Sequence, residues 1–416
     1  MGSRTEGLDD IRCKESEAQR KAQTMAITDL EGSFRSNEEI VGRVDINDPN
    51  AILSVTTLDE TELIHAVQDN AEAIFTWGYD KGERAKLDKL YEKAKTSQWN
   101  ATTDLDWTTD VDIEKMIREQ NETFNPGATS LVPPFDVSGT PLANWGDKEF
   151  LELGIESQNH LLSQFMHGEQ GALLCTAKIV ETVPWIDAKY YAATQVVDEA
   201  RHVEVFSRYL DEKLEGNYPI NAHLRMLLDD IINDSRWDMT YLGMQIMVEG
   251  LALAAFGMLH STTNEPLLKK LLRYVMSDEA RHVAFGVLSL EEYYQELSSA
   301  ELRERQEFAF EAAVRMRDRF LQQEVWQRYD IDMAPLIPLM QQDPGRILFQ
   351  QLLFSKIVPN CKKLGLLDAG VPEGQKGWLR ERFEEMDVIQ FEDFVDTSEE
   401  FGDLDAVEQD REEASA

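Results

Sequence analysis

The sequence Asp-Glu-Ala-Arg-His-Val occurs twice in this chain, at residues 198–203 and again at 278–283, an offset of 80 residues. Six identical residues are too many for coincidence in a chain of 416. The same offset relates two earlier glutamates, Glu169 and Glu249. Each half of the repeat therefore has a glutamate and, 30 residues later, the pattern Glu-x-x-His. We expect the two halves to share one local structure.

A proline-containing turn lies midway between the two glutamates of each half, at 183–185 in the first half and at 263–266 in the second. Such breakers end helices, and the flanking segments have an almost continuous helical pattern. Each half is therefore predicted to be an antiparallel helical hairpin whose two glutamates lie at one height. Two such hairpins form a four-helix bundle with all these side chains in one layer.

The spacing within Glu-x-x-His directs both side chains toward one place, because residues three apart lie about 60° around a helix and ~4.5 Å along it. Four buried carboxylates and two imidazoles would be strongly destabilising without positive charge. Two divalent cations balance four carboxylates, and this oxygen-rich set suits iron or manganese better than zinc. The predicted metal ligands are Glu169, Glu199, His202, Glu249, Glu279 and His282.

Four charged residues of the repeat are predicted to support these ligands. Asp198 and Asp278 lie four residues before the ligand histidines and are expected to accept their second imidazole N–H, each from the opposite histidine. Arg201 and Arg281 are expected to neutralise these aspartates. The alternative is that all four are ordinary surface charges on a helix.

Residues one or two turns from the ligands are candidate walls of a substrate pocket, with ordinary bundle core as the alternative. These are Leu173, Thr176, Gln195, Phe206, Gln245, Leu253, Phe256 and Gly257. The other five histidines are expected to be structural, and His160 and His167 in particular face away from the predicted metals. Cys175 is expected to be a buried core thiol.

The composition describes an acidic globular protein, with 41 Lys+Arg against 78 Asp+Glu and a net charge of −37. No basic excess is available to bind nucleic acid or anionic lipid. Three scattered cysteines fit neither a disulfide framework nor a zinc site, and no apolar signal segment is visible, so a cytoplasmic location is expected. Residues 239–264 are long enough to span a membrane. We expect them to form a buried helix instead, because polar residues interrupt them and no second such segment exists.

An all-α architecture is predicted, since no segment alternates with period two. Helices are expected from 58 to 99, a loop-rich stretch from 100 to 147, and a capping box at Ser298 and Glu301 that begins another helix. The last 30 residues hold 12 acidic side chains against one basic and are expected to be solvated. The predicted organisation is a polar N-terminal segment (1–57), a helical and loop region (58–147), the bundle core (148–297), C-terminal helices (298–386) and an acidic tail (387–416).

The repeated pattern, over about residues 169–290, resembles the ferritin-like di-iron carboxylate superfamily. It is similar to the form found in multicomponent monooxygenase hydroxylases, ribonucleotide reductase small subunits and acyl-carrier-protein desaturases. The resemblance implies two iron ions, with manganese and iron as the alternative pair, and activation of O2 by the reduced pair. It also implies that Glu169, Glu199 and His202 hold one ion. Glu249, Glu279 and His282 would hold the other.

The chain departs from each of these branches. Phe206 stands where ribonucleotide reductase small subunits carry a radical tyrosine, and Val275 where N-oxygenases of the p-aminobenzoate type add a histidine. Ala252 and Leu253 stand where hydroxylases and desaturases place a threonine. We therefore expect a non-haem di-iron oxygenase of unassigned branch, which hydroxylates, desaturates or N-oxygenates a small organic substrate. The alternatives are a ferritin-like ferroxidase or iron-binding protein, and a radical or oxidase protein like the ribonucleotide reductase small subunit.

Electrons are expected to come from a separate ferredoxin or reductase, because the chain has neither a Gly-x-Gly-x-x-Gly motif nor an iron–sulfur cysteine pattern. A homodimer is the default expectation for assembly.

Overall fold

The computed structural model describes residues 45–55, 64–133, 135–214, 216–372, 374–394 and 406–415. Within these ranges all regular structure is helical, as predicted. The elements outside the bundle are α3 (Pro49–Leu53), α4 (Ala85–Thr96), α5 (Ile113–Phe124), η1 (Pro141–Asn144), η2 (Leu210–Leu214), α8 (Ala222–Asn233), α12 (Ser299–Arg319), α13 (Gln323–Gln327), α14 (Ile337–Gln342), α15 (Pro344–Leu353), α16 (Ile357–Lys363), α17 (Trp378–Glu385), η4 (Ile389–Phe391) and α19 (Ala406–Ser415).

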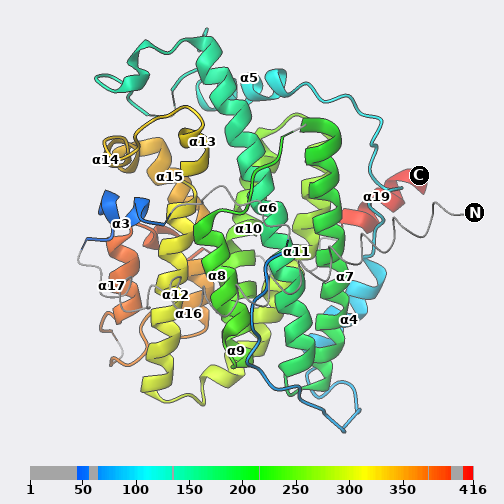
Figure 1. Ribbon diagram of the computed structural model, residues 1–416. Coiled ribbons are helices and arrows are strands. Elements are labelled where there is room, and N and C mark those ends of the chain that lie inside the picture. The colour runs from blue at the N-terminus through cyan, green and yellow to red at the C-terminus, as the bar shows by residue number, and fades with distance from the viewer. Residues whose placement is uncertain are drawn as a thin grey trace, which may run out of the picture.

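Four long helical segments form the central bundle (Figure 1). They are α6 (Asp147–Thr182), α7 (Ile186–Tyr209), the run of α9 (Trp237–Tyr241), η3 (Leu242–Val248) and α10 (Glu249–Thr262), and α11 (Pro266–Tyr294). The segments α6 and α7 pack as one hairpin, and α10 and α11 as the other. The prediction of a ferritin-like four-helix bundle is confirmed.

The two hairpin turns lie where the prolines required them. The α6 helix ends at Thr182, two residues before Pro184, because the residue before a proline is disfavoured in helical conformation. At the second turn Pro266 begins α11, and the Glu265 side chain accepts hydrogen bonds from the first free backbone N–H groups of this helix. These turns fix the height of the glutamates on either side of them.

The run Trp237–Thr262 is long and apolar enough to cross a membrane. In the described fold, 83% of its most apolar stretch of 18 residues is buried. It contacts α6, α11 and α12, which surround it on several sides. Its middle, Leu242–Val248, is π-helical and leads directly into Glu249. A π-helical turn shifts the register of the residues that follow it, and such turns often occur at functional sites.

Further helices cover the bundle on opposite sides (Figure 1). The helix α4 packs on α7 and α11, while α12 packs on α8 and η3. The predicted capping box begins α12, with the Ser298 hydroxyl accepting from the Glu301 N–H and the Glu301 carboxylate accepting from the Ser298 N–H. The helix stops at Arg319, because the chain turns there before α13, where Gln322 has a left-handed φ of 54°.

Two expectations for the N-terminal region were wrong. Residues 64–80 are not helical, although their apolar residues keep a helical period. The segment runs along the outside of the bundle with the Phe75 side chain 75% exposed, and its backbone pairs with other segments, as in the 2.9 Å bond from the Ile74 N–H to the Glu181 carbonyl. Conversely, α5 lies inside the predicted loop stretch. It buries only Met116 and Ile117.

Part of the predicted acidic tail packs on the fold instead of being solvated. Ala406 and Val407, at the start of α19, are buried. Asp410 accepts hydrogen bonds from Arg273 and from the Tyr274 hydroxyl on α11. The tail was predicted from charge alone, and these basic and hydroxyl partners on the bundle were not visible in that pattern.

We predict opposite effects for alanine at two glycines of the bundle. A Cβ at Gly286 would lie 2.5 Å from the Cβ of Gln245, whereas a Cβ at Gly168 would meet nothing within 4 Å. Gly286→Ala should therefore destabilise the protein by about 1–3 kcal/mol through overpacking. Gly168→Ala should stabilise it by about 0.5–1 kcal/mol, because alanine is the better helix former. Urea unfolding of the two metal-free variants measures both effects, and equal stabilities would contradict the close packing of α11 on η3.

Candidate metal centre

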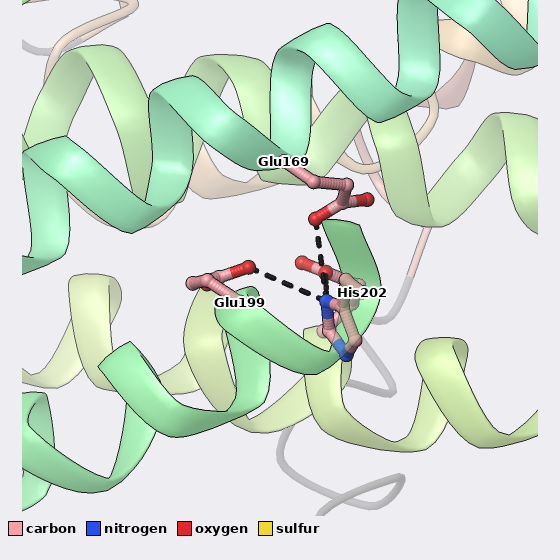
Figure 2. Close-up of side chains that lie close together, drawn as sticks. Glu169, Glu199 and His202 are labelled. Atoms are coloured by element: carbon pink, nitrogen blue, oxygen red, sulfur yellow. Dashed lines mark hydrogen bonds and ion pairs between the residues drawn. The ribbon is translucent and has the colours of Figure 1, made fainter. Parts of the chain in front are cut away.

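The six predicted ligands come together in the middle of the bundle. Glu169 projects from α6, and Figure 2 shows it pointing toward Glu199 and His202 of α7. Glu249 is the first residue of α10, and Glu279 and His282 lie on α11. All six side chains are buried, and none is more than 5% exposed. The repeat therefore converges from four helices on one layer, the geometry that its spacing required.

Glu199 and Glu279 lie between the two imidazoles. The Nδ1 atom of His202 is 3.3 Å from Glu199 Oε2 and 3.1 Å from Glu279 Oε1. The Nδ1 atom of His282 is 3.1 Å from Glu199 Oε1 and 3.5 Å from Glu279 Oε2. These two carboxylates are thus placed to bridge a pair of ions.

The two outer glutamates complete two overlapping ligand groups. Glu169 Oε2 lies 3.2 Å from His202 Nδ1. One group whose donor atoms all lie within 4.8 Å of one another comprises Glu169, Glu199, His202 and Glu279, and the other comprises Glu199, Glu249 and His282. Two groups that share a carboxylate match a pair of neighbouring divalent cations.

An aspartate of the other hairpin contacts the Nε2 atom of each candidate ligand histidine. Asp278 Oδ2 lies 3.1 Å from Nε2 of His202, and Asp198 Oδ2 lies 3.3 Å from Nε2 of His282. A carboxylate on Nε2 fixes the N–H there and leaves Nδ1 free to bind a metal. The structure thus has the crossed arrangement expected from the pseudo-symmetry of the repeat.

The two arginines of the repeat lie among these aspartates. Arg201 donates to Asp198 at 2.5 Å and to Asp278 at 3.1 Å, and Arg281 donates to Asp278. All four side chains are buried, which argues against the alternative that they are surface charges. The two arginines and two aspartates balance one another, so the negative charge of the four glutamates must be balanced by something else.

The donor atoms fit a metal pair. Several buried carboxylate oxygens have no hydrogen-bond donor among the described residues, namely Glu199 Oε2, Glu249 Oε2 and both oxygens of Glu279. Buried acceptors without partners are costly, and cations on them would remove that cost. Four carboxylates also match the charge of two divalent ions.

Burial and mutual repulsion set the protonation of the centre when no metal is bound. Burial, together with the charge of Glu279, raises the pKa of Glu169 to about 8, and burial and the charge of Glu199 raise the pKa of Glu249 well above its ordinary value. Burial acts to lower the pKa of His202, but its bonds to Asp278 and Glu169 outweigh burial and raise it. The metal-free centre therefore holds extra protons at neutral pH.

Gln195 makes the two halves of the centre unlike. Its Nε2 donates to Glu199 Oε1 at 2.8 Å and to Glu249 Oε1 at 2.9 Å. The position related to it by the repeat is Val275, which has no amide. Gln195 was predicted as a pocket wall, but its contacts are those of a residue that orients two ligands.

A cavity of about 20 Å³ lies beside Glu169, Glu249 and Glu279, enough for one water molecule. Its other lining residues are Gln164, Phe165, Gly168, Ala172, Val248, Ala252 and Arg319. The eight predicted pocket residues are not among them. Leu253 packs with Ala280 and Val283, and Phe206 packs on Phe256 at 5.6 Å, so these residues belong to the bundle core.

Sequence reasoning missed a layer contributed by the segment after α4. The indole N–H of Trp99 donates to Asp278 Oδ2 at 2.8 Å, and Gln98 accepts from Arg201 and donates to Asp198. The Arg201 guanidinium also lies over the Trp99 ring, 4.8 Å from its centroid. No repeat or fixed spacing links these residues to the ligands, so the repeated motif did not indicate their contacts with it.

The fold is a ferritin-like helical bundle, and its buried carboxylates and imidazoles form a candidate di-metal site. No model of a known protein family matches the chain, and no curated protein matches it. Among solved structures, one variant of an R2-like ligand-binding oxidase with an anaerobically reconstituted Mn/Fe cofactor matches with 20% identity and a TM-score of 0.47. A variant with a non-activated Mn/Mn cofactor matches with 18% identity and a TM-score of 0.46. Both matches cover 68% of this chain and 94% of the oxidase chain.

We predict that metal binding releases protons. Metal ligation needs ionised carboxylates and neutral imidazoles. The raised pKa values of Glu169, Glu249 and His202 mean that the metal-free protein holds protons at pH 7 that the metal-bound protein does not. Affinity should therefore rise with pH up to about 8, the pKa of Glu169, and fall as the solution becomes more acidic.

Calorimetric titration of the metal-free protein with Fe²⁺ without oxygen, in buffers of different ionisation enthalpy, measures this proton release. We expect more than one proton per chain. An observed enthalpy that does not depend on the buffer would contradict the protonation described above.

Proposed function

We propose that this protein is a di-metal carboxylate oxidase that reduces O2 at a buried pair of metal ions, two irons or one manganese and one iron. The observation that carries the proposal is the pair of overlapping, buried ligand groups with a shared carboxylate. Many carboxylate oxygens and few nitrogens suit iron and manganese. When bound in the reduced state, such ions supply electrons to O2.

The chain's own residues hold the site in position and keep it dry. Glu199 and Glu279 span the two ion positions, while Asp198 and Asp278 fix the ring orientation of the histidines. The Phe165 ring lines the cavity and packs edge-on against Phe256, with centroids 4.7 Å apart. Such a wall excludes bulk water, which would otherwise consume a reactive oxidant.

The size of the cavity favours an oxidase over an oxygenase. Space for a single water molecule admits O2 but not an organic substrate beside the carboxylates. The second candidate is the predicted oxygenase reaction, in which a small organic substrate is hydroxylated, desaturated or N-oxygenated. The small residues Gly168, Ala172 and Ala252 in the cavity wall favour it, because modest movement of α6 and α10 would enlarge the space there.

One-electron oxidation of a tyrosine is a further form of the oxidase proposal. Tyr191 lies on α7, fully buried, with its ring 4.4 Å from that of Phe285. Its hydroxyl has no hydrogen-bond partner among the described residues. Burial holds the pKa of this phenol above its ordinary range, so the proton stays on the oxygen at neutral pH.

We further propose that a separate ferredoxin or reductase of the cytoplasm supplies the electrons. The support for this is the sequence, which has no nucleotide-binding or iron–sulfur motif of its own. The two cysteines in the described ranges are buried free thiols, as suits a reducing compartment.

Metal analysis together with oxygen consumption tests the proposal. We expect about two metal ions per chain, as the ligand groups require, and O2 uptake by the reduced protein without any added organic substrate. Spin resonance of the same sample reports whether Tyr191 is oxidised, with Tyr191→Phe as the matched variant. Uptake that needs an organic substrate would favour the oxygenase, and binding of many irons per chain would favour a ferroxidase or storage protein.

We predict that Glu199→Gln lowers metal content to about one ion per chain or less. Glu199 belongs to both ligand groups, so neutralising it weakens both ion positions. Glu204→Gln on the exposed face of the same helix is the matched control and should keep full occupancy. Elemental analysis after desalting measures the difference. Full metal content in Glu199→Gln would count against the ligand assignment.

A further inference from the structure

Arg319 is a buried cation with no acidic partner among the described residues, and its guanidinium lies 5.1 Å from the centroid of the Phe320 ring. It is the last residue of α12, is 5% exposed, and makes no ion pair with any described residue. Its Nη1 atom has no hydrogen-bond acceptor. The other buried arginines of the same helix do have acidic partners. Arg305 pairs with Asp238, Arg315 with Glu311, and Arg317 with Asp318.

Arg319 lines two adjoining cavities. The first is the cavity beside Glu169, Glu249 and Glu279. The second, of about 10 Å³, shares Gln164, Phe165 and Arg319 with the first. Its remaining lining residues are His160, Leu161, Phe320 and Gln322. Arg319 thus lies in the wall between a cavity beside the candidate metal ligands and a second small cavity.

The other polar groups of the second cavity are mostly occupied elsewhere. The Gln164 amide donates to the Pro219 carbonyl and accepts from the Asn221 N–H. His160 Nε2 lies 3.0 Å from Glu324 Oε2, which leaves Nδ1 without a partner in the described structure. The unpaired groups that face this space are therefore a guanidinium and an imidazole nitrogen.

We propose that these adjoining cavities bind a carboxylate anion, with Arg319 as its principal partner. An uncompensated buried cation is strongly unfavourable, and the planar guanidinium fork matches a carboxylate in charge and shape. The partial negative charge at the end of α12 gives some compensation, but Nη1 still has no hydrogen-bond acceptor among the described residues. The two cavities are small, so the anion at Arg319 is limited to a group no larger than formate, either a free acid or the carboxylate end of a longer molecule.

Two further facts support this site. Burial lowers the pKa of Arg319 to about 10, so the guanidinium still carries its charge at neutral pH. Gln322 takes a left-handed conformation although it is not glycine, and this turn places Gln322 and Arg319 on the same cavity. The proposal does not depend on the oxidase reaction, because Arg319 is not a metal ligand.

Thermal unfolding in the presence of sodium formate tests the site. Sodium gluconate, which is too large for the cavity, holds the ionic strength constant. We expect the unfolding midpoint of the wild type to rise with formate concentration, as linkage requires when a ligand binds the folded state. Arg319→Met should lose this response. Without formate it should be at least as stable as the wild type, because it removes an unpaired buried charge.

Arg315→Met is the matched control on the same helix. It breaks the pair with Glu311 and should lower the midpoint, but it should keep the formate response. An equal formate response in the wild type and Arg319→Met, or no response in the wild type, would overturn the proposal. So would a response that disappears on chelation of the metals and survives in Arg319→Met, because formate would then be on the ions.

Acetate and butyrate in place of formate distinguish the two sources of the carboxylate. Weaker binding with each added carbon indicates a free small acid. Tighter binding indicates that the group is the end of a longer molecule. Either trend supports the site if it is lost in Arg319→Met, and a trend that is the same in Arg319→Met contradicts it.

Discussion

The balance of charge in the bundle interior determines the rest of this structure. Four glutamates are buried within a few ångströms of one another, and the nearby arginines are already paired with aspartates. Such a cluster is stable only with protons or cations on it. The same requirement explains why buried carboxylate oxygens of the candidate ligands have no hydrogen-bond donor among the described residues, and why the metal-free centre holds protons.

Local features of the backbone bring these glutamates together. Pro184 and Pro266 fix the hairpin turns, so the glutamates on either side of each turn lie at the same height. The π-helical segment before Glu249 sets the direction from which this carboxylate enters. Gly286 allows α11 to approach η3 closely within the second hairpin. Precise placement of the side chains therefore depends on backbone features that carry no charge themselves.

The sequence predicted the bundle, and the meeting of the six candidate ligands in it, because the repeat supplied an internal comparison. A single Glu-x-x-His is weak evidence, but two copies at an offset of 80 residues constrain both helix pairing and height. Residues outside the repeat have no second copy with which a prediction could be compared. The helical period of 64–80 was misleading, since that segment finds its hydrogen bonds along the surface. Trp99, Gln98 and Arg319 reach the centre only through tertiary packing, which spacing along the chain does not reveal.

The crossed pairing of histidines and aspartates has one further consequence. His202 of the first hairpin is braced by Asp278 of the second, and His282 of the second by Asp198 of the first. Neither hairpin alone can make a complete half of the centre, although each contains a full copy of the motif. The duplication is therefore obligate rather than redundant, because loss of an aspartate in one copy removes the partner of the imidazole in the other.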